Sequence, residues 1–475
     1  MCDSESTLKT TSESTKQEPA ILDHTEISSF VSGFLQRRDV FLQACHRYGS
    51  PLYVVEESVL IERAEQFTDA FSQELPDVRV YYAMKSNNHP LIVKTLVNAG
   101  LNLDVSSGLE LEIALDTDAA DIVFSGPGKT KKELTLAVEN SDRITVLIDS
   151  FGELEHLQRV AAEKDASIRA GVRLTIDSHG LWRKFGIPLK DLSKFLDAAK
   201  HCDHVSINGL QFHTSWNLDP YNQVNFIACL GNTLSKLTSE QSSMIEFIDI
   251  GGGFWPSQGE WLQSSGIPLS HSSSATKLGS VSKTCHYKRQ STTIEEFAGQ
   301  IAQAVCTHLF PYVSCRICAE PGRWLCNDAM HLLLTVLDKK AKDLVITDAG
   351  TNAIGWERFE TDYFPVINLS RPEPIEHECY ILGSLCTPHD VWGYAYWGKG
   401  IEPGDVLMIP TQGAYTYSLR QEFIKPLPKV VMLDKKIVLK GAEQMSKKTN
   451  KKKQKLSKNA GKSRYTRRQK IEKSI

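Results

Sequence analysis

Long apolar stretches are absent from this sequence. The chain has 475 residues, and none of its apolar runs approaches the ~20 residues that a helix needs to cross a bilayer. The polar first residues also lack the apolar core of a signal peptide. We therefore expect no membrane span and a cytoplasmic location. Hydrophobic residues form 41% of the chain and charged residues 23%, a balance typical of globular proteins.

The cysteines show no pairing pattern. All eleven are scattered, odd in number and mostly inside apolar segments, as expected of reduced thiols in a protein core. Cys315 and Cys318 have the spacing of half a zinc site, but Val313–Ala319 is predicted to be a strand. Residues three apart on a strand point to opposite faces, so the sequence predicts no metal site.

The net charge of −3 hides a strong asymmetry. From Lys447 onward, 13 Lys and Arg accompany a single Glu, which leaves 41 basic and 56 acidic residues on the rest of the chain. Such a segment cannot bury a core, so residues 441–475 are predicted to be a disordered basic tail, and residues 1–25 to be disordered too. The tail could contact an acidic partner, nucleic acid or a nuclear import receptor, or be solvated without a specific partner.

The middle of the chain alternates short apolar strands with helical stretches. Residues 55–325 contain the length and pattern of eight βα units, which is typical of a TIM barrel, whereas a doubly wound sheet normally has fewer strands. The predicted strands are Arg79–Met84, Leu101–Val105, Asp121–Ser125, Ile144–Asp149, Ile168–Leu174, Gly209–His213, Phe247–Ile250 and Arg316–Ala319. Residues 256–291 form a Ser-rich insertion, and loops of such length are usually functional or mobile.

The strand pattern changes after the barrel. Strands without crossover helices predict an antiparallel β-sandwich or barrel-like domain at residues 326–440, with residues 26–54 packing against it. These strands are His331–Leu337, Leu344–Thr347, Phe364–Leu369, Glu378–Leu382, Val406–Pro410 and Val430–Leu433. The predicted fold class is therefore α/β, with a (β/α)8 barrel followed by a β domain.

Polar residues follow the predicted strands at the end where TIM barrels carry catalytic groups. A lysine such as Lys85, directly after a buried strand, is costly unless it is functional or paired, although it could simply be the first exposed residue of a loop. The glycines Gly251–Gly253 lack Cβ atoms and let the backbone approach an anion. Together with Arg323, they predict a phosphate site at the mouth of the barrel.

Six short motifs follow one another along the chain. They are Tyr82-Ala83-Met84-Lys85, Asp104-Val105-Ser106-Ser107-Gly108, Asp249-Ile250-Gly251-Gly252-Gly253-Phe254, Glu320-Pro321-Gly322-Arg323, Gly383-Ser384-Leu385-Cys386 and Gly413-Ala414-Tyr415-Thr416. In this order they resemble the motifs of the fold-type-III pyridoxal-phosphate (PLP) decarboxylases, the group of the diaminopimelate, ornithine and arginine decarboxylases. The motif style is closest to the diaminopimelate type, and the resemblance runs from about Gly49 to Pro428. The resemblance implies a PLP-binding barrel and a homodimer with shared active sites.

The resemblance also implies a role for each matched residue. Lys85 would hold PLP as a Schiff base, Glu320 would keep the pyridine nitrogen protonated to stabilise a quinonoid carbanion, and Cys386 from the partner subunit would reprotonate it. His213 would stack on the ring. The implied cofactor contacts are Lys85, Asp104, Arg173, His213, Ser215, Gly251, Gly252, Gly253, Glu320, Arg323 and Tyr415. The implied substrate contacts are Asp390, Arg358 and Cys386.

The sequence departs from the family pattern near the substrate. Thr214-Ser215-Trp216 follows His213, where the family usually has Gly-Ser, and Ser215 is the candidate substitute. Thr387 stands where the family carries an acidic residue after the loop cysteine. An expected Arg-Pro pair is missing, and Arg358 is its candidate replacement. We therefore expect a basic or diamino acid as substrate without naming it.

Two alternatives to a decarboxylase are open from the sequence alone. The first is an inactive decarboxylase-like protein that binds or regulates a partner through its basic tail. Whatever the function, the tail could also direct the protein to the nucleus. The second is an amino-acid racemase. Glu320 disfavours the racemase, because the alanine racemases that resemble this fold place an arginine at the ring nitrogen, which weakens the electron sink.

Overall fold

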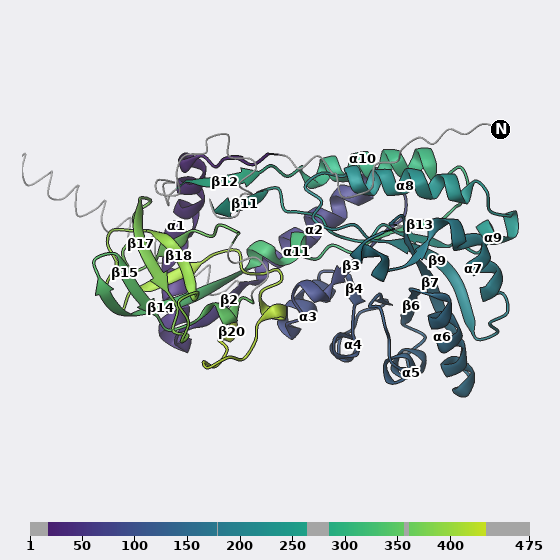
Figure 1. Cartoon of the computed structure of the whole chain (residues 1–475), viewed down its shortest axis with the longest axis horizontal. Coiled ribbons are helices and arrows are strands. Elements are labelled where there is room, and N and C mark those ends of the chain that lie inside the picture. The colour runs from purple at the N-terminus through teal and green to yellow at the C-terminus, as the bar shows by residue number, and fades with distance from the viewer. Residues whose placement is uncertain (1–17, 178, 264–284, 356–360, 434–475) are drawn as a thin grey trace, which may run out of the picture.

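Two bodies lie side by side along the long axis of the molecule, a helix-covered barrel and a β domain (Figure 1). The computed structural model describes residues 18–177, 179–263, 285–355 and 361–433. The tail predicted for residues 441–475 lies outside the described residues. The prediction of disorder for residues 1–25 is wrong at its end, because Ala20–Ile21 form strand β1 and helix α1 begins at His24.

The barrel is closed by eight parallel strands, each of which coincides with a strand predicted from the sequence. Their order is β6-β5-β4-β3-β13-β10-β9-β7, and β6 pairs with β7 to close the ring. The strands are β3 (Val78–Ala83), β4 (Asn102–Val105), β5 (Ile122–Phe124), β6 (Ile144–Ile148), β7 (Ile168–Thr175), β9 (Val205–Phe212), β10 (Phe247–Asp249) and β13 (Arg316–Ala319). A short strand, β8 (Ile187–Pro188), adds to the outside of β7.

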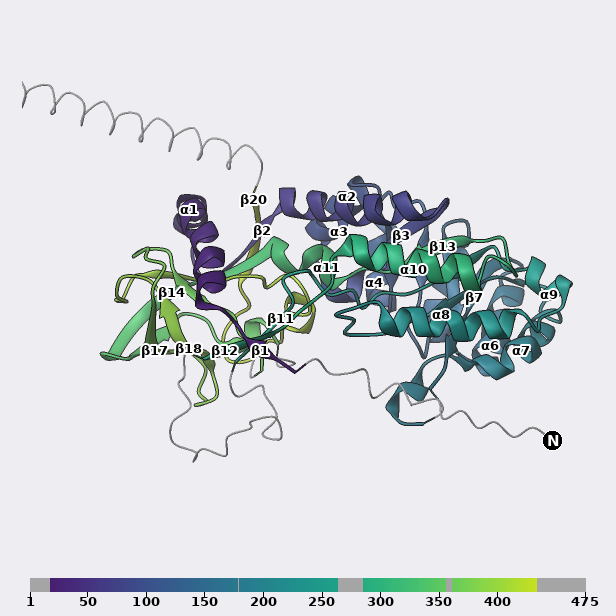
Figure 2. The ribbon, with the colours of Figure 1, turned by 90° about the horizontal axis from the view of Figure 1, so that it is seen from above.

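Helices cover the barrel because their starts are capped and their inner faces are apolar. Thr130 and Thr293 each form a capping box with a glutamate three residues on, which stabilises the first turn. The helices are α2 (Glu57–Glu74), α3 (Pro90–Asn98), α4 (Gly108–Leu115), α5 (Lys131–Glu139), α6 (Phe151–Glu163), α7 (Leu192–Ala199), α8 (Tyr221–Leu234), α9 (Ser239–Ser243), α10 (Ile294–His308) and α11 (Arg323–Cys326). Seen from above, α2, α8 and α10 lie along one side (Figure 2).

The β domain is a mostly antiparallel sheet of eight strands that also closes on itself. Its order is β15-β17-β18-β16-β19-β14-β2-β20, with β14 paired to β15. The strands are β2 (Leu52–Glu56), β14 (Met330–Ala341), β15 (Leu344–Thr347), β16 (Val366–Asn368), β17 (Glu376–Leu382), β18 (Val391–Trp397), β19 (Val406–Ile409) and β20 (Lys429–Leu433). Three pairs, β2–β20, β15–β17 and β16–β18, are parallel, and the sequence did not predict β2 and β18 as strands.

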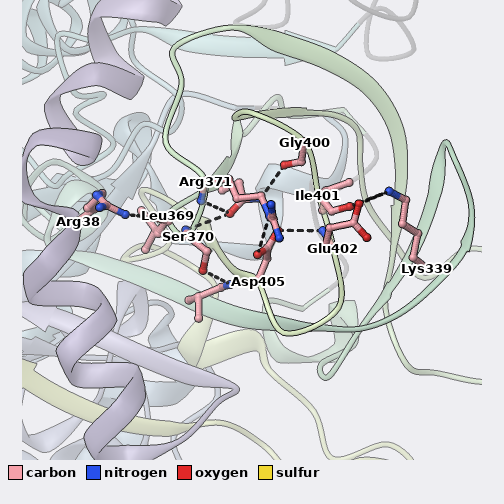
Figure 3. A network of polar contacts seen from close by, with 11 residues as sticks. Arg38, Lys339, Leu369, Ser370, Arg371, Gly400, Ile401, Glu402 and Asp405 are labelled. Atoms are coloured by element: carbon pink, nitrogen blue, oxygen red, sulfur yellow. Dashed lines mark hydrogen bonds and ion pairs between the residues drawn. The ribbon is translucent and has the colours of Figure 1, made fainter.

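Helix α1 (His24–Tyr48) packs on the β domain through aromatic side chains. Phe34 and Phe41 present ring edges to the buried His331 of β14, at centroid distances of 5.0 and 5.7 Å. Arg38 of the helix donates to the Leu369 carbonyl at 2.7 Å. That contact continues into a network on the loops around Asp405, whose carboxylate accepts from Arg371 at 2.9 Å (Figure 3). The helix is therefore an integral layer of this domain.

The insertion in the barrel begins and ends in paired strands. β11 (Glu260–Gln263) and β12 (His286–Arg289) are antiparallel neighbours, and β1 adds to β12 as a third strand. Residues 264–284, between β11 and β12, are outside the described residues. Both ends of the predicted insertion are thus ordered and lie beside the β domain (Figure 2).

Candidate active site

Lys85 and Asp104 form an ion pair at the carboxyl end of the barrel. Lys85 follows β3 and Asp104 lies in β4, and the lysine Nζ atom is 2.9 Å from Asp104 Oδ2. The Asp104 side chain is completely buried, whereas that of Lys85 is 31% exposed. Burial lowers the pKa of Lys85, but the Asp104 and Glu320 carboxylates outweigh burial and raise this pKa above its usual value.

Glu320 lies next to this pair, just after β13, and is 1% exposed. Its carboxylate accepts two long hydrogen bonds from the Gln211 amide, at 3.3 and 3.5 Å. Burial would raise the pKa of Glu320, but the polar and charged groups around the carboxylate, among them the Lys85 and Arg173 cations, lower it below the usual range. Glu320 is therefore an ionised carboxylate with capacity to accept a further donor.

His213 is a neutral ring in this site. Its Nδ1 atom accepts a hydrogen bond from the Gly252 amide at 3.1 Å and lies 3.7 Å from a Glu320 oxygen. An Nδ1 atom that accepts an amide proton cannot carry its own, so the ring proton is on Nε2. Burial lowers the pKa of His213, which keeps the ring uncharged at neutral pH.

The segment Gly251–Gly253 after β10 has no space for side chains. A Cβ atom on Gly252 would lie 2.2 Å from the Glu320 carbonyl oxygen, and one on Gly253 would lie 2.2 Å from the Thr214 carbonyl oxygen. Gly251 and Gly253 also have positive φ angles of 68° and 80°. The segment can therefore pass directly against the backbones that carry His213 and Glu320.

Arg323 and Tyr415 meet where the barrel joins the β domain. The Arg323 guanidinium lies 5.0 Å from the Tyr415 ring centroid and 4.4 Å from that of Trp255. All three line one cavity with Trp261 of the insertion. Tyr415 has a left-handed φ of 57°, and its amide donates to the Ser86 carbonyl beside Lys85 at 2.8 Å. Both predicted phosphate contacts thus lie near the lysine.

Two other predicted cofactor contacts flank this group. Arg173 of β7 is buried, donates to the Ser125 carbonyl at 3.3 Å and stacks on Phe185 at 4.5 Å. Ser125 in turn donates through its hydroxyl to Asp104. Ser215 borders the third glycine, since a Cβ on Gly253 would lie 3.1 Å from the Ser215 Cα. Trp216 beside it has a φ of 52° and is 50% exposed.

The predicted substrate contacts differ from the cofactor contacts, because those that the structure describes belong to the β domain and not to the barrel that carries Lys85. Cys386 is exposed on the loop between β17 and β18. Asp390 is 1% exposed, and its two oxygens accept from the Thr351 and Leu385 amides, both at 2.7 Å. We predicted a substrate contact for Asp390, but its carboxylate is engaged in shaping the Cys386 loop. Arg358 lies outside the described residues.

Sequence reasoning did not assign roles to two buried polar residues, Gln211 and Asp249. Gln211 of β9 is 1% exposed and donates to Glu320, and Asp249 at the end of β10 is completely buried. The sequence did contain a signal for them, because each is a polar residue in an apolar strand. Burying such a residue is costly unless it is paired or functional, which is the argument that singled out Lys85.

Other kinds of site find no support among the described residues. In that part of the chain, no three His, Cys, Asp or Glu side chains are grouped as a metal site would need. Nor is any helix there long and apolar enough to cross a membrane.

Known proteins share both the sequence pattern and this fold. Residues 60–327 match the family model described as pyridoxal-dependent decarboxylase, pyridoxal binding domain. The diaminopimelate decarboxylase of Aquifex aeolicus is 27% identical over 79% of this chain and 84% of its own length. An L-glutamyl-[BtrI acyl-carrier protein] decarboxylase of Niallia circulans is 25% identical over 78% and 85%. These relatives carry different substrates in their names.

A solved structure gives the same result. The diaminopimelate decarboxylase of M. jannaschii in co-complex with L-lysine has a TM-score of 0.69 and 26% identity, and the match covers 83% of this chain and 89% of that one. The residues at this site fit PLP. The segment Gly251–Gly253, Arg323 and Tyr415 suit its phosphate, and Lys85 and the ionised Glu320 suit its aldehyde and its ring nitrogen. The chain belongs to the pyridoxal-dependent decarboxylase family and is a PLP-dependent amino-acid decarboxylase.

Proposed function

We propose that this protein decarboxylates a basic or diamino acid at a site completed by a second copy of the chain. The observation that carries the proposal is the Lys85–Asp104 ion pair of 2.9 Å with the ionised Glu320 beside it, at the mouth of one barrel. The names of relatives such as diaminopimelate decarboxylase support a substrate with a second amino group. The name of another relative, L-glutamyl-[BtrI acyl-carrier protein] decarboxylase, gives a substrate attached to a carrier protein.

Each end of the cofactor has its own contacts in the proposed site. Gly251–Gly253, Arg323 and Tyr415 would hold the phosphate, with Ser215 at the edge of the glycine segment. Bound PLP supplies an electrophilic aldehyde and an electron-poor ring that takes up the electron pair left by departing CO2. Glu320 would accept a hydrogen bond from the ring nitrogen and keep a proton there. The neutral His213 can lie against such a ring without repelling its positive charge.

Lys85 must lose a proton before its amine can attack a carbonyl group. Asp104 Oδ2 is the atom placed to accept that proton, 2.9 Å from Nζ. Burial and the neighbouring Glu320 raise the pKa of Asp104, which makes it a better base than an ordinary aspartate. Arg173 and Ser125 hold this end of the site through their contact at 3.3 Å.

Cys386 is the proposed acid that returns a proton to the substrate carbon. It is exposed in the single chain, on a loop that Asp390 holds through two backbone amides. A loop held in this way can present a side chain outward, into the site of a neighbouring copy. Thr387 places no carboxylate beside it, so a distal ammonium of the substrate needs another partner.

The first experiment is a visible absorption spectrum followed by CO2 release from a panel of amino acids. The panel contains meso-diaminopimelate, lysine, ornithine, arginine and glutamate. We expect a cofactor band in the purified protein and CO2 from one substrate, and Lys85→Ala should abolish both because no other amine would hold the cofactor. Lys132→Ala, which removes an 89% exposed lysine, is the matched control and should change neither. CO2 release that persisted in Lys85→Ala, or no band even with excess PLP, would contradict the proposal.

A further inference from the structure

Asp249 is a buried acid that the proposed mechanism leaves without a role. It ends strand β10 and has an exposed fraction of 0%. Its Oδ1 atom accepts a hydrogen bond from the Gly251 amide at 2.8 Å. Its Oδ2 atom is also buried, yet it has no hydrogen-bond donor among the residues that the structure describes. An ionised oxygen in that position would be costly, so Oδ2 is the natural place for a proton.

The register of the barrel strands decides what surrounds Asp249. Asp249 is aligned with Gln211 of β9 and with Cys318 of β13, and aligned residues of neighbouring strands point to the same face of a sheet. Two residues beyond Cys318 comes Glu320, which points the same way. Its carboxylate accepts from Gln211 and lies within hydrogen-bonding contact of the Asp249 carboxyl. Two buried acids therefore lie in contact inside the barrel.

Two carboxylates in such contact do not both ionise. The Lys85 and Arg173 cations are among the groups that lower the pKa of Glu320 despite its burial. Burial and the charge of Glu320 raise the pKa of Asp249 well above its usual value. The other titratable groups that face Asp249 are Asp104, which has the same effect, and the Cys318 thiol, whose own pKa is raised by burial. The charge therefore belongs on Glu320 and the proton on Asp249.

We infer that Asp249 is a positioning residue whose Oδ2–H donates a hydrogen bond to the Glu320 carboxylate. The inference rests on the proposed contact between Glu320 and the ring nitrogen. A donor on one side of Glu320 fixes the orientation of its carboxylate, and the other side is left to meet the ring. Because Asp249 also accepts from the Gly251 amide, it links the ring-nitrogen end of the site to the phosphate end.

The decisive test is the infrared difference spectrum of the apoprotein at neutral pH, wild type minus Asp249→Asn. We expect the substitution to remove a carbonyl-stretching band of a protonated carboxyl group, and Glu320→Gln to remove a carboxylate band instead. If Asp249→Asn removed a carboxylate band, the inference would be overturned. The spectrum is recorded without cofactor, so it tests the inference independently of activity. If the acid band is found but the protein releases no CO2 in the activity assay, that result counts against the proposed function alone.

A second measurement asks whether the hydrogen bond matters for the cofactor. Asp249→Leu should weaken PLP binding at least about tenfold, because a donor to a charged group is lost. Asp249→Asn should restore most of that affinity, since its amide donates to Glu320 and accepts from Gly251. PLP titration followed by fluorescence gives both values. Equal losses in the two variants would overturn the inference, because a side chain that can donate to Glu320 would then support PLP binding no better than one that cannot.

Discussion

Single polar residues at strand ends make up the proposed site. Lys85 and Glu320 stand inside recognisable motifs, so their positions were predictable without knowing the fold. Gln211 and Asp249 were not assigned roles, because their meaning depends on strand register, which aligns them across β9 and β10. The contacts of Asp390 were likewise hidden, since its amide donors include Thr351, from a distant part of the chain.

Gly252 offers a test at the residue scale. Gly252→Ala should abolish PLP binding, because its Cβ would lie 2.2 Å from the Glu320 carbonyl oxygen and push apart the segment and the glutamate. The matched control is Gly299→Ala in α10, where an added Cβ meets nothing within 4 Å. It should bind PLP normally and gain about 0.5–1 kcal/mol of stability from helix propensity. Absorbance titration with PLP and thermal melts measure the two effects, and normal PLP binding by Gly252→Ala would refute the steric argument.

Whole elements were predicted from the sequence where their pattern is local. All eight barrel strands are short apolar runs between helical stretches, so periodicity alone revealed them. Strand β18 was missed because its sequence, Val391–Trp397, contains Gly393 and does not alternate clearly. The parallel pairs of the β domain were also missed, because such pairing depends on segments far apart in the chain, as in β2 and β20.

His89 at the start of α3 gives a prediction at the scale of one element. Its Nδ1 atom accepts from the Leu91 amide at 3.3 Å, and burial with the nearby Arg420 lowers its pKa from 6.5 to about 4. The unfolded chain therefore takes up a proton below pH 6.5 that the folded protein refuses until about pH 4. Stability present above pH 6.5 should thus be lost as the pH falls through this window, by about 1–2 kcal/mol after solvent screening.

Calorimetric melting temperatures across this pH range can check the loss. His89→Asn keeps an N-cap acceptor but cannot titrate, so its stability should fall less steeply with acid than that of the wild type. The exposed His201, changed to asparagine, serves as the control for the substitution itself. An unchanged acid slope in His89→Asn would show that other groups, such as His213, account for the loss.

At the scale of the whole molecule, the proposed site needs two chains. Lys85 and Glu320 belong to one barrel, whereas Cys386 lies exposed on a β-domain loop. In a symmetric pair of chains with two shared sites, two different inactive variants can restore activity to each other, which is impossible if each chain carries a complete site. Lys85→Ala and Cys386→Ala, each inactive alone, should together regain roughly a quarter of the wild-type activity after subunit exchange, since half of the mixed dimers' sites are intact.

The control mixture combines Lys85→Ala with Glu320→Ala. Both residues serve the same barrel, so every site of a mixed dimer carries one defect and no activity should return. CO2 release after mixing at equal concentrations measures both outcomes. If the first mixture also stayed inactive although mixed dimers had formed, Cys386 would not act across the interface.

The pairing of β2 with β20 also bears on how the protein is made. Helix α1 and β2 precede the barrel strands in the chain and are synthesised before them, whereas β20, which β2 needs as a neighbour, follows the barrel strands. The barrel strands lie between them in the chain, so the barrel can close before β20 has been synthesised. Until the β domain forms, the aromatic side chains of α1 that pack on His331 remain exposed. Until β20 has been synthesised, a nascent chain therefore carries an unpaired strand edge and exposed apolar surface that favour aggregation.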